Sequence, residues 1–125
     1  MKTLNKHAID RVINLNAKER YDYFVKKVVD SEKLWGLFDG GWALVGDINQ
    51  NVYLPLWPDE EFAEMLTAKE WNGYSPKEID LYEFVDKIVH KLESTNVSVC
   101  VFLTHKEQGV CIPCRQLVFD LKRAM

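Results

Sequence analysis

The sequence predicts an α+β fold in which helices pack on a mostly antiparallel sheet of about five strands. Apolar residues recur at helical spacing in some segments and form short β-like runs in others. The run of hairpin-length connections favours antiparallel pairing with segregated helices. The predicted order of elements is roughly ααβββααββα, and a chain of 125 residues suits a single globular domain over residues 1–125.

Two helices are predicted to open the chain. The first covers residues 4–14, where apolar residues return every three or four positions. The second begins after Asn16, because Asn16 and Glu19 have the spacing of a capping box, and it ends near Ser31.

Three strands are predicted next, over residues 34–38, 42–45 and 52–57. Residues 39–41 read Asp-Gly-Gly, a turn signal, so the first two strands are expected to form a hairpin. Pro55 has no N–H to donate, so the third strand is expected at an edge of the sheet or with a bulge.

The middle of the chain predicts two further helices with a loop between them. The first opens at Pro58, with Glu60 and Glu61 in the turn where carboxylates suit the helix dipole. Residues 71–79 are interpreted as a loop. The second helix begins at Asp80-Leu81-Tyr82-Glu83, which again has the form of a capping box.

The C-terminal third predicts two strands and a closing helix. Residues 97–103 carry the strongest strand signal, and residues 110–112 form a short second strand. The last helix is predicted over roughly 113–123.

Composition and charge narrow the classes of function. The net charge of −3 argues against sequence-independent binding to nucleic acid. The first 15 residues include Lys6, Asp10 and Arg11 where a signal peptide needs an unbroken apolar run, and no stretch is long enough to predict a membrane span. Three cysteines without such a signal suit a reducing cytoplasm, so a cytoplasmic protein is expected.

The middle of the chain is acidic and holds all the tryptophans. Residues 34–86 carry eleven Asp or Glu against two Lys, and all four Trp lie there. Trp57 and Trp71 are expected to be partly exposed. An acidic surface that bears tryptophans attracts cations from a distance and binds apolar groups on contact. A basic protein or peptide is the expected partner. The predicted binding residues are Trp57, Asp59, Glu60, Glu61, Trp71 and Tyr74.

Cys111-Ile112-Pro113-Cys114 resembles the active motif of thiol–disulfide oxidoreductases. Only eleven residues follow Cys114, too few for the strands and helices that follow this motif in a thioredoxin fold. Cys111 and Cys114 nevertheless remain candidate reactive thiols. Cys111 is expected to be buried, whereas Cys114 lies in the first turn of a helix, where the dipole lowers a thiol pKa. Cys114 is therefore expected to react faster than Cys100.

A zinc site is the other interpretation of the cysteines. Cys100, His105, Cys111 and Cys114 supply a Cys₃His set, but their spacing is irregular for structural zinc. The sequence also lacks phosphate-binding, dinucleotide-binding and metalloprotease motifs. No metal, no cofactor and no catalytic residue is predicted.

Several fragments together resemble a known family. They are RYDYFVKKVVDSEKLWGL, GWAL, LPLWPDEEFAE, EWNGY, IDLYEFVDK and VFLT, between Arg20 and Leu121. In this combination the sequence is similar to the family catalogued as domain of unknown function 2750. The resemblance implies a small, single-domain, bacterial protein in the cytoplasm, with no assigned activity. Cys111 and Cys114 lie within the similar region but are not part of the family's pattern.

Three hypotheses of function follow, in order of preference. The first is a non-enzymatic protein-interaction module that uses the acidic, tryptophan-bearing surface. The second is a small-ligand or metal-binding protein with a site at Cys111 and Cys114. The third is a thiol-dependent or hydrolytic enzyme, for which the sequence nominates no catalytic set.

Overall fold

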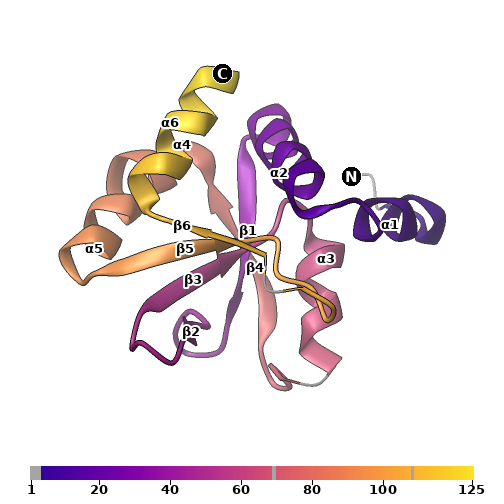
Figure 1. Ribbon diagram of the computed structural model, residues 1–125, viewed down its shortest axis with the longest axis horizontal. Helices are drawn as coiled ribbons and strands as arrows, with labels where there is room; N and C mark the ends of the chain where they lie inside the picture. Colours follow the sequence, from indigo (N-terminus) through magenta and orange to yellow (C-terminus); the bar gives the residue numbers. More distant parts are fainter. Residues whose placement is uncertain (1–3, 69, 108) are drawn as a thin grey trace.

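The computed structural model describes residues 4–68, 70–107 and 109–125, and it confirms the α+β class (Figure 1). Helices flank two small sheets that meet near the middle of the molecule. The helical elements are α1 (Lys6–Ile13), α2 (Ala17–Ser31), α3 (Glu60–Glu64) with a 3₁₀ turn (Met65–Ala68), α4 (Leu81–Glu83), a π turn (Phe84–Ile88), α5 (Val89–Ser94) and α6 (Cys114–Ala124). The strands are β1 (Lys33–Phe38), β2 (Val45–Gly46), β3 (Val52–Leu56), β4 (Ser75–Asp80), β5 (Val97–Val101) and β6 (Val110–Ile112).

Local capping fixes where the first two helices begin. The Asn5 side chain accepts a hydrogen bond from the Ala8 N–H at the start of α1. At α2, Asn16 accepts from the Glu19 N–H while the Glu19 carboxylate accepts from the Asn16 N–H, which confirms the capping box.

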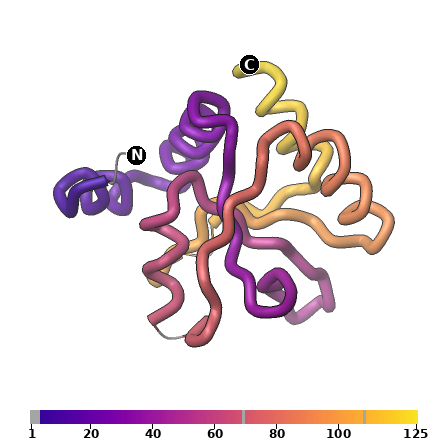
Figure 2. The backbone as a smooth tube through the Cα atoms, turned by 180° about the vertical axis from the view of Figure 1, so that it is seen from behind, coloured from indigo at the N-terminus to yellow at the C-terminus, as the bar shows by residue number. Residues whose placement is uncertain are grey.

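The strands form two sheets instead of the single one predicted. β1 and β4 pair antiparallel as a two-stranded sheet and run side by side in Figure 2. The other sheet has the order β2-β3-β5-β6. Its outer pairs are antiparallel, and its central pair, β3 with β5, is parallel.

Trp35 and Trp57 join the two sheets. The N–H of Trp35 donates to the Trp57 carbonyl at 2.9 Å, and the N–H of Trp57 donates to the Trp35 carbonyl at 2.8 Å. This single antiparallel bridge continues β3 onto β1. The hydrogen-bonded network therefore runs from β4 to β6 across both sheets.

The predicted hairpin between residues 34–38 and 42–45 is wrong beyond its turn. The turn forms, with Gly40 at φ +71° and a bridge between Phe38 and Trp42. The chain then leaves β1, and Val45 pairs with Tyr53 of β3. The partner of β1 is β4, in the segment interpreted as a loop. Its sequence, SPKEID, is polar, and only Ile79 is fully buried, so tertiary pairing decides its conformation.

Pro55 corrects a second expectation, since β3 lies inside the sheet. The Leu56 carbonyl accepts from the Phe102 N–H, so the backbone groups of Leu56 face β5 and those of Pro55 face the other way. On that side β2 pairs only with Val52 and Tyr53. Pro55 falls in the gap between β2 and the Trp35–Trp57 bridge, where a missing N–H costs no ladder hydrogen bond.

The helix from Leu81 to Ser94 contains a π turn. The Asp80 side chain accepts from the Glu83 N–H at its start, and the Val89 N–H donates to the Phe84 carbonyl five residues back. Phe84 and Val89 are both buried as a result. In the described part of the chain, no helix combines the length and apolarity that crossing a membrane requires.

We expect Trp57→Ala to lower the free energy of unfolding by about 3–5 kcal/mol, the usual cost of removing a buried Trp. The side chain is 0% exposed, and its loss also leaves the Leu103 carbonyl without the indole N–H. Urea unfolding of wild type and variant measures the difference. Phe119→Ala, at a residue 55% exposed on α6, is the control and should cost less than about 1 kcal/mol. Equal costs would contradict the role given to Trp57.

Candidate functional site

Trp57 lies at the centre of the fold, so its predicted exposure is wrong. Its Nε1–H donates to the Leu103 carbonyl at 2.8 Å, and its ring packs edge-on against Trp71 at a centroid distance of 6.4 Å. The backbone bridge to Trp35 draws the residue inside the molecule. A partner at the surface cannot contact it.

Two of the three predicted carboxylates make contacts within the protein. Asp59 is buried, lies 3.4 Å from Lys27 Nζ and accepts a hydrogen bond from the Tyr23 hydroxyl at 3.1 Å. Burial raises the pKa of Asp59, against the opposite effect of Lys27. Glu61 is half-buried and accepts from the Leu4 N–H at 3.2 Å. Neither carboxylate is fully available to an outside cation.

The other residues of the predicted binding surface are at least partly exposed to solvent. Glu60 is exposed, and Trp71 and Tyr74 are half-buried. Glu64 is also exposed, one turn after Glu60 on α3. We call the four residues Glu60, Glu64, Trp71 and Tyr74 the acidic face, and that they bind a partner together stays a prediction.

The structure reverses the expected exposure of the two thiols in the Cys-x-x-Cys motif. Cys111 is exposed on the edge strand β6, whereas Cys114 is only 2% exposed. Cys114 faces the core together with Leu117 and Leu121 of α6, at i, i+3 and i+7. Burial raises the pKa of Cys114 to about 11, and Glu93 adds to the rise. Desolvation thus outweighs the effect of the helix N-terminus, which by itself would lower the pKa of this thiol.

The Cys₃His set does not assemble. Cys100 and Cys111 are neighbours, but Cys114 Sγ lies 3.4 Å from the Val97 carbonyl oxygen. His105 Nε2 lies 2.8 Å from the Met65 carbonyl oxygen. Among residues 4–68, 70–107 and 109–125, no three His, Cys, Asp or Glu side chains are placed to share a metal ion.

A cavity that the sequence did not reveal lies between β4, the helix from Leu81 to Ser94 and the segment after the Gly40 turn. Its volume is about 660 Å³, within the range typical of small-molecule sites. Leu44 at its mouth is 49% exposed. We call it the Trp42 cavity, and its apolar lining consists of Trp42, Leu44, Leu54, Ile79, Ile88, Leu92 and Val97.

Glycine and aromatic contacts hold Trp42 in this wall. A Cβ at Gly36 would come within 2.9 Å of the Trp42 ring, so only glycine lets the indole lie over β1. The Phe38 ring packs edge-on against Trp42 at 5.1 Å. Lys77 Nζ lies 4.0 Å from the Phe38 ring centroid and 5.6 Å from that of Trp42, within cation–π range.

The rim of the Trp42 cavity carries charges of both signs. Of its carboxylates, Glu78 lies 3.8 Å from Lys33 and Asp80 caps the following helix, whereas Glu83 is exposed. Lys87 and Lys91 are exposed one turn apart, and neither forms an ion pair with a described residue. A ligand with an anionic group can therefore meet two cations above an apolar floor.

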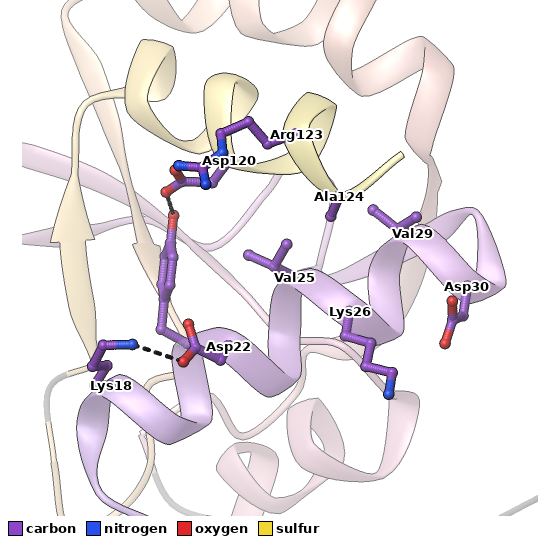
Figure 3. Close-up of a pocket in the computed structure, with 10 residues that line it drawn as sticks. Lys18, Asp22, Val25, Lys26, Val29, Asp30, Asp120, Arg123 and Ala124 are labelled. Atoms are coloured by element: carbon purple, nitrogen blue, oxygen red, sulfur yellow. Dashed lines mark hydrogen bonds and ion pairs between the residues drawn. The ribbon is translucent and has the colours of Figure 1, made fainter.

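A second groove, between α2 and α6, has a different character (Figure 3). Its volume is about 640 Å³, and Val25, Val29 and Ala124 line it. Two of its carboxylates are engaged within the protein. Lys18 Nζ lies 2.9 Å from the Asp22 carboxylate, and the Tyr21 hydroxyl donates to Asp120. Its aliphatic lining, Val25, Val29 and Ala124, is smaller than the apolar lining of the Trp42 cavity.

Comparison with known proteins identifies a family whose description names no activity. The model of the family described as "Protein of unknown function (DUF2750)" matches residues 21–121, which is most of the chain. No curated protein matches the sequence.

We expect Cys111 to be alkylated first in the native protein. It is exposed, whereas Cys100 and Cys114 are buried and burial raises the pKa of both thiols. Timed treatment with iodoacetamide followed by peptide mapping measures the three rates. Labelling of Cys114 at the rate of Cys111 would contradict the placement of α6.

Proposed function

We propose that this chain, which belongs to the DUF2750 family of proteins of unknown function, binds a small amphipathic anion in the Trp42 cavity. The observation that carries the proposal is the combination of an apolar cavity of about 660 Å³ with Lys87 and Lys91 at its rim. The proposal concerns binding and assigns no reaction.

The apolar lining determines the body of the ligand. Burying a methylene group contributes about 0.8 kcal/mol, so a chain of several carbons gains most of its affinity from Trp42, Ile88 and Leu92. The indole of Trp42, held from below by Gly36, gives this wall a rigid flat surface. Such a surface binds with little loss of conformational entropy.

The rim determines the head group. Lys87 and Lys91 lie at i and i+4, so their side chains leave the same face of the helix. A carboxylate or phosphate between two ammonium groups forms charge-assisted hydrogen bonds, which are stronger than neutral ones. This arrangement favours an anion over a neutral or cationic head.

We expect decanoate to bind more tightly than decanol, by about tenfold, and the preference to disappear in Lys87→Ala/Lys91→Ala. Removing both ammonium groups removes the reason for the preference and leaves the apolar contacts in place. Isothermal titration calorimetry with both probes measures the four affinities.

A matched control separates this cavity from the groove between α2 and α6. Lys18→Ala/Lys26→Ala changes two exposed lysines at that groove and should leave both affinities unchanged. Equal binding of decanoate and decanol to wild type, or a loss caused by Lys18→Ala/Lys26→Ala, would reject the proposal.

The acidic face is a second candidate, since Glu60 and Glu64 are both exposed on one side of α3. We propose that this face attracts a basic protein or peptide, with apolar contact from Trp71 and Tyr74. Glu61 is better left intact, because it accepts the Leu4 N–H.

Glu60→Lys/Glu64→Lys is expected to slow association with a lysine-rich peptide that contains tryptophan, and to reduce the salt dependence of the rate. Stopped-flow fluorescence at two salt concentrations measures both effects. Asp30→Lys/Asp86→Lys, which changes two exposed carboxylates on other helices, makes the same change in net charge and is the control. An equal effect of the control, or no binding by the wild type, would remove this candidate.

A further inference from the structure

Cys100 and Cys111 form a cross-strand pair that the Cys-x-x-Cys motif obscures. Cys100 of β5 is directly opposite Cys111 of β6 in the antiparallel register. The Cys111 thiol donates to Cys100 Sγ at 2.9 Å. Eleven residues apart in sequence, the two sulfurs are in contact in the fold.

The backbone at this pair suits a disulfide. The Phe102 N–H donates to the Leu56 carbonyl, so the N–H of Phe102 faces β3. Because backbone groups alternate along a strand, those of Cys100 also face β3 and do not bond to Cys111. In such a non-hydrogen-bonded antiparallel pair the Cα atoms are typically about 4.5 Å apart, within the range that a disulfide spans.

Gly109 fixes this register. Its φ is +84°, and a Cβ there would come within 2.5 Å of the Val101 carbonyl oxygen. Only glycine allows the chain to approach β5 so closely at the start of β6. Cys111 is therefore held opposite Cys100.

The pair also has the access that a thiol reaction requires. Both cysteines line a cavity of about 620 Å³ together with Val45, Tyr53 and Leu103. Cys111 is exposed and Cys100 is buried behind it. A small reagent can reach Cys111 first, and Cys100 is in place to react second.

We propose that Cys100 and Cys111 are a redox modification site, which a low-molecular-weight disulfide converts to a reversible cross-strand disulfide. The Cys111 thiolate attacks one sulfur of the reagent and releases its first thiol, which leaves a mixed disulfide on Cys111. Cys100 then loses its proton and attacks Cys111 Sγ, and the second small thiol leaves. Two protein thiols are oxidised, and one reagent disulfide is reduced to two thiols.

The bond ties the edge strand to the sheet and so closes the connection that carries Glu107. Glu107 forms an ion pair with Arg20, which is buried and also donates to the carbonyls of Ile13 and Leu15. Oxidation therefore fastens the segment that anchors the start of α2. Heat unfolding of the oxidised protein is expected at a higher temperature than that of the reduced protein.

The test is to treat the reduced native protein with glutathione disulfide, unfold it in urea with N-ethylmaleimide to block all remaining thiols, and map tryptic peptides without reduction. Lys106 separates Cys100 from Cys111, whereas no Lys or Arg lies between Cys111 and Cys114. A Cys100–Cys111 bond therefore links two peptides, and a Cys111–Cys114 bond stays within one. We expect the two peptides to be joined by a disulfide. Two of the three cysteines should then carry no maleimide, and both should be labelled again after reduction with dithiothreitol.

Two variants complete the test. Cys100→Ser should retain glutathione on Cys111, because the resolving thiol is gone, and its unfolding temperature should not rise as that of the oxidised wild type does. Cys114→Ala should still form the linked pair. A bond within the single peptide, a lasting glutathione adduct on the wild type, or no reaction would each overturn the proposal.

Discussion

The two-way hydrogen bond between the backbones of Trp35 and Trp57 is the constraint on which the rest of the structure depends. It joins the two-stranded sheet to the four-stranded sheet, and it buries the Trp57 indole against the Leu103 carbonyl. With β1 fixed to β3 at this point, β4 has a defined edge to pair with. Gly36, one residue after Trp35, then lies beneath the ring of Trp42. The Trp42 cavity is therefore a consequence of how the sheets meet.

The sequence predicts the local features well because their causes lie within a few residues. The Asn16 capping box, the turn at Gly40 and the helix that Asp80 caps all appear in the structure. Pairing between strands that are distant in the sequence is not predicted in this way. The strand Ser75–Asp80 has weak intrinsic β propensity, and it is a strand because β1 offers an unpaired edge. Sequence periodicity carries no signal for such a partner.

In the candidate site, too, local features are predicted from the sequence and long-range contacts are not. Composition locates eleven carboxylates between residues 34 and 86, but it does not reveal that Asp59 lies beside Lys27 or that Glu61 accepts the Leu4 N–H. The Cys-x-x-Cys spacing predicts that Cys111 and Cys114 act together. The antiparallel register of β5 and β6 instead places Cys111 opposite Cys100. The cavity lining comes from five separate segments. The spacing of Lys87 and Lys91, four residues apart on an amphipathic helix, could have indicated its rim, but lysines at this spacing are typical of any solvated helix face.

The central claim is that this protein binds its ligand in the Trp42 cavity, and the indole resonances test it most directly. The chain has four tryptophans, and two of them report on the competing surfaces: Trp42 lines the cavity, and Trp71 lies on the acidic face. A ¹H–¹⁵N spectrum recorded during titration with decanoate should show a saturable shift of the Trp42 indole and of the Leu44 amide, with Trp71 unmoved. A shift of Trp71 alone, or no saturable shift at Trp42, would contradict the account.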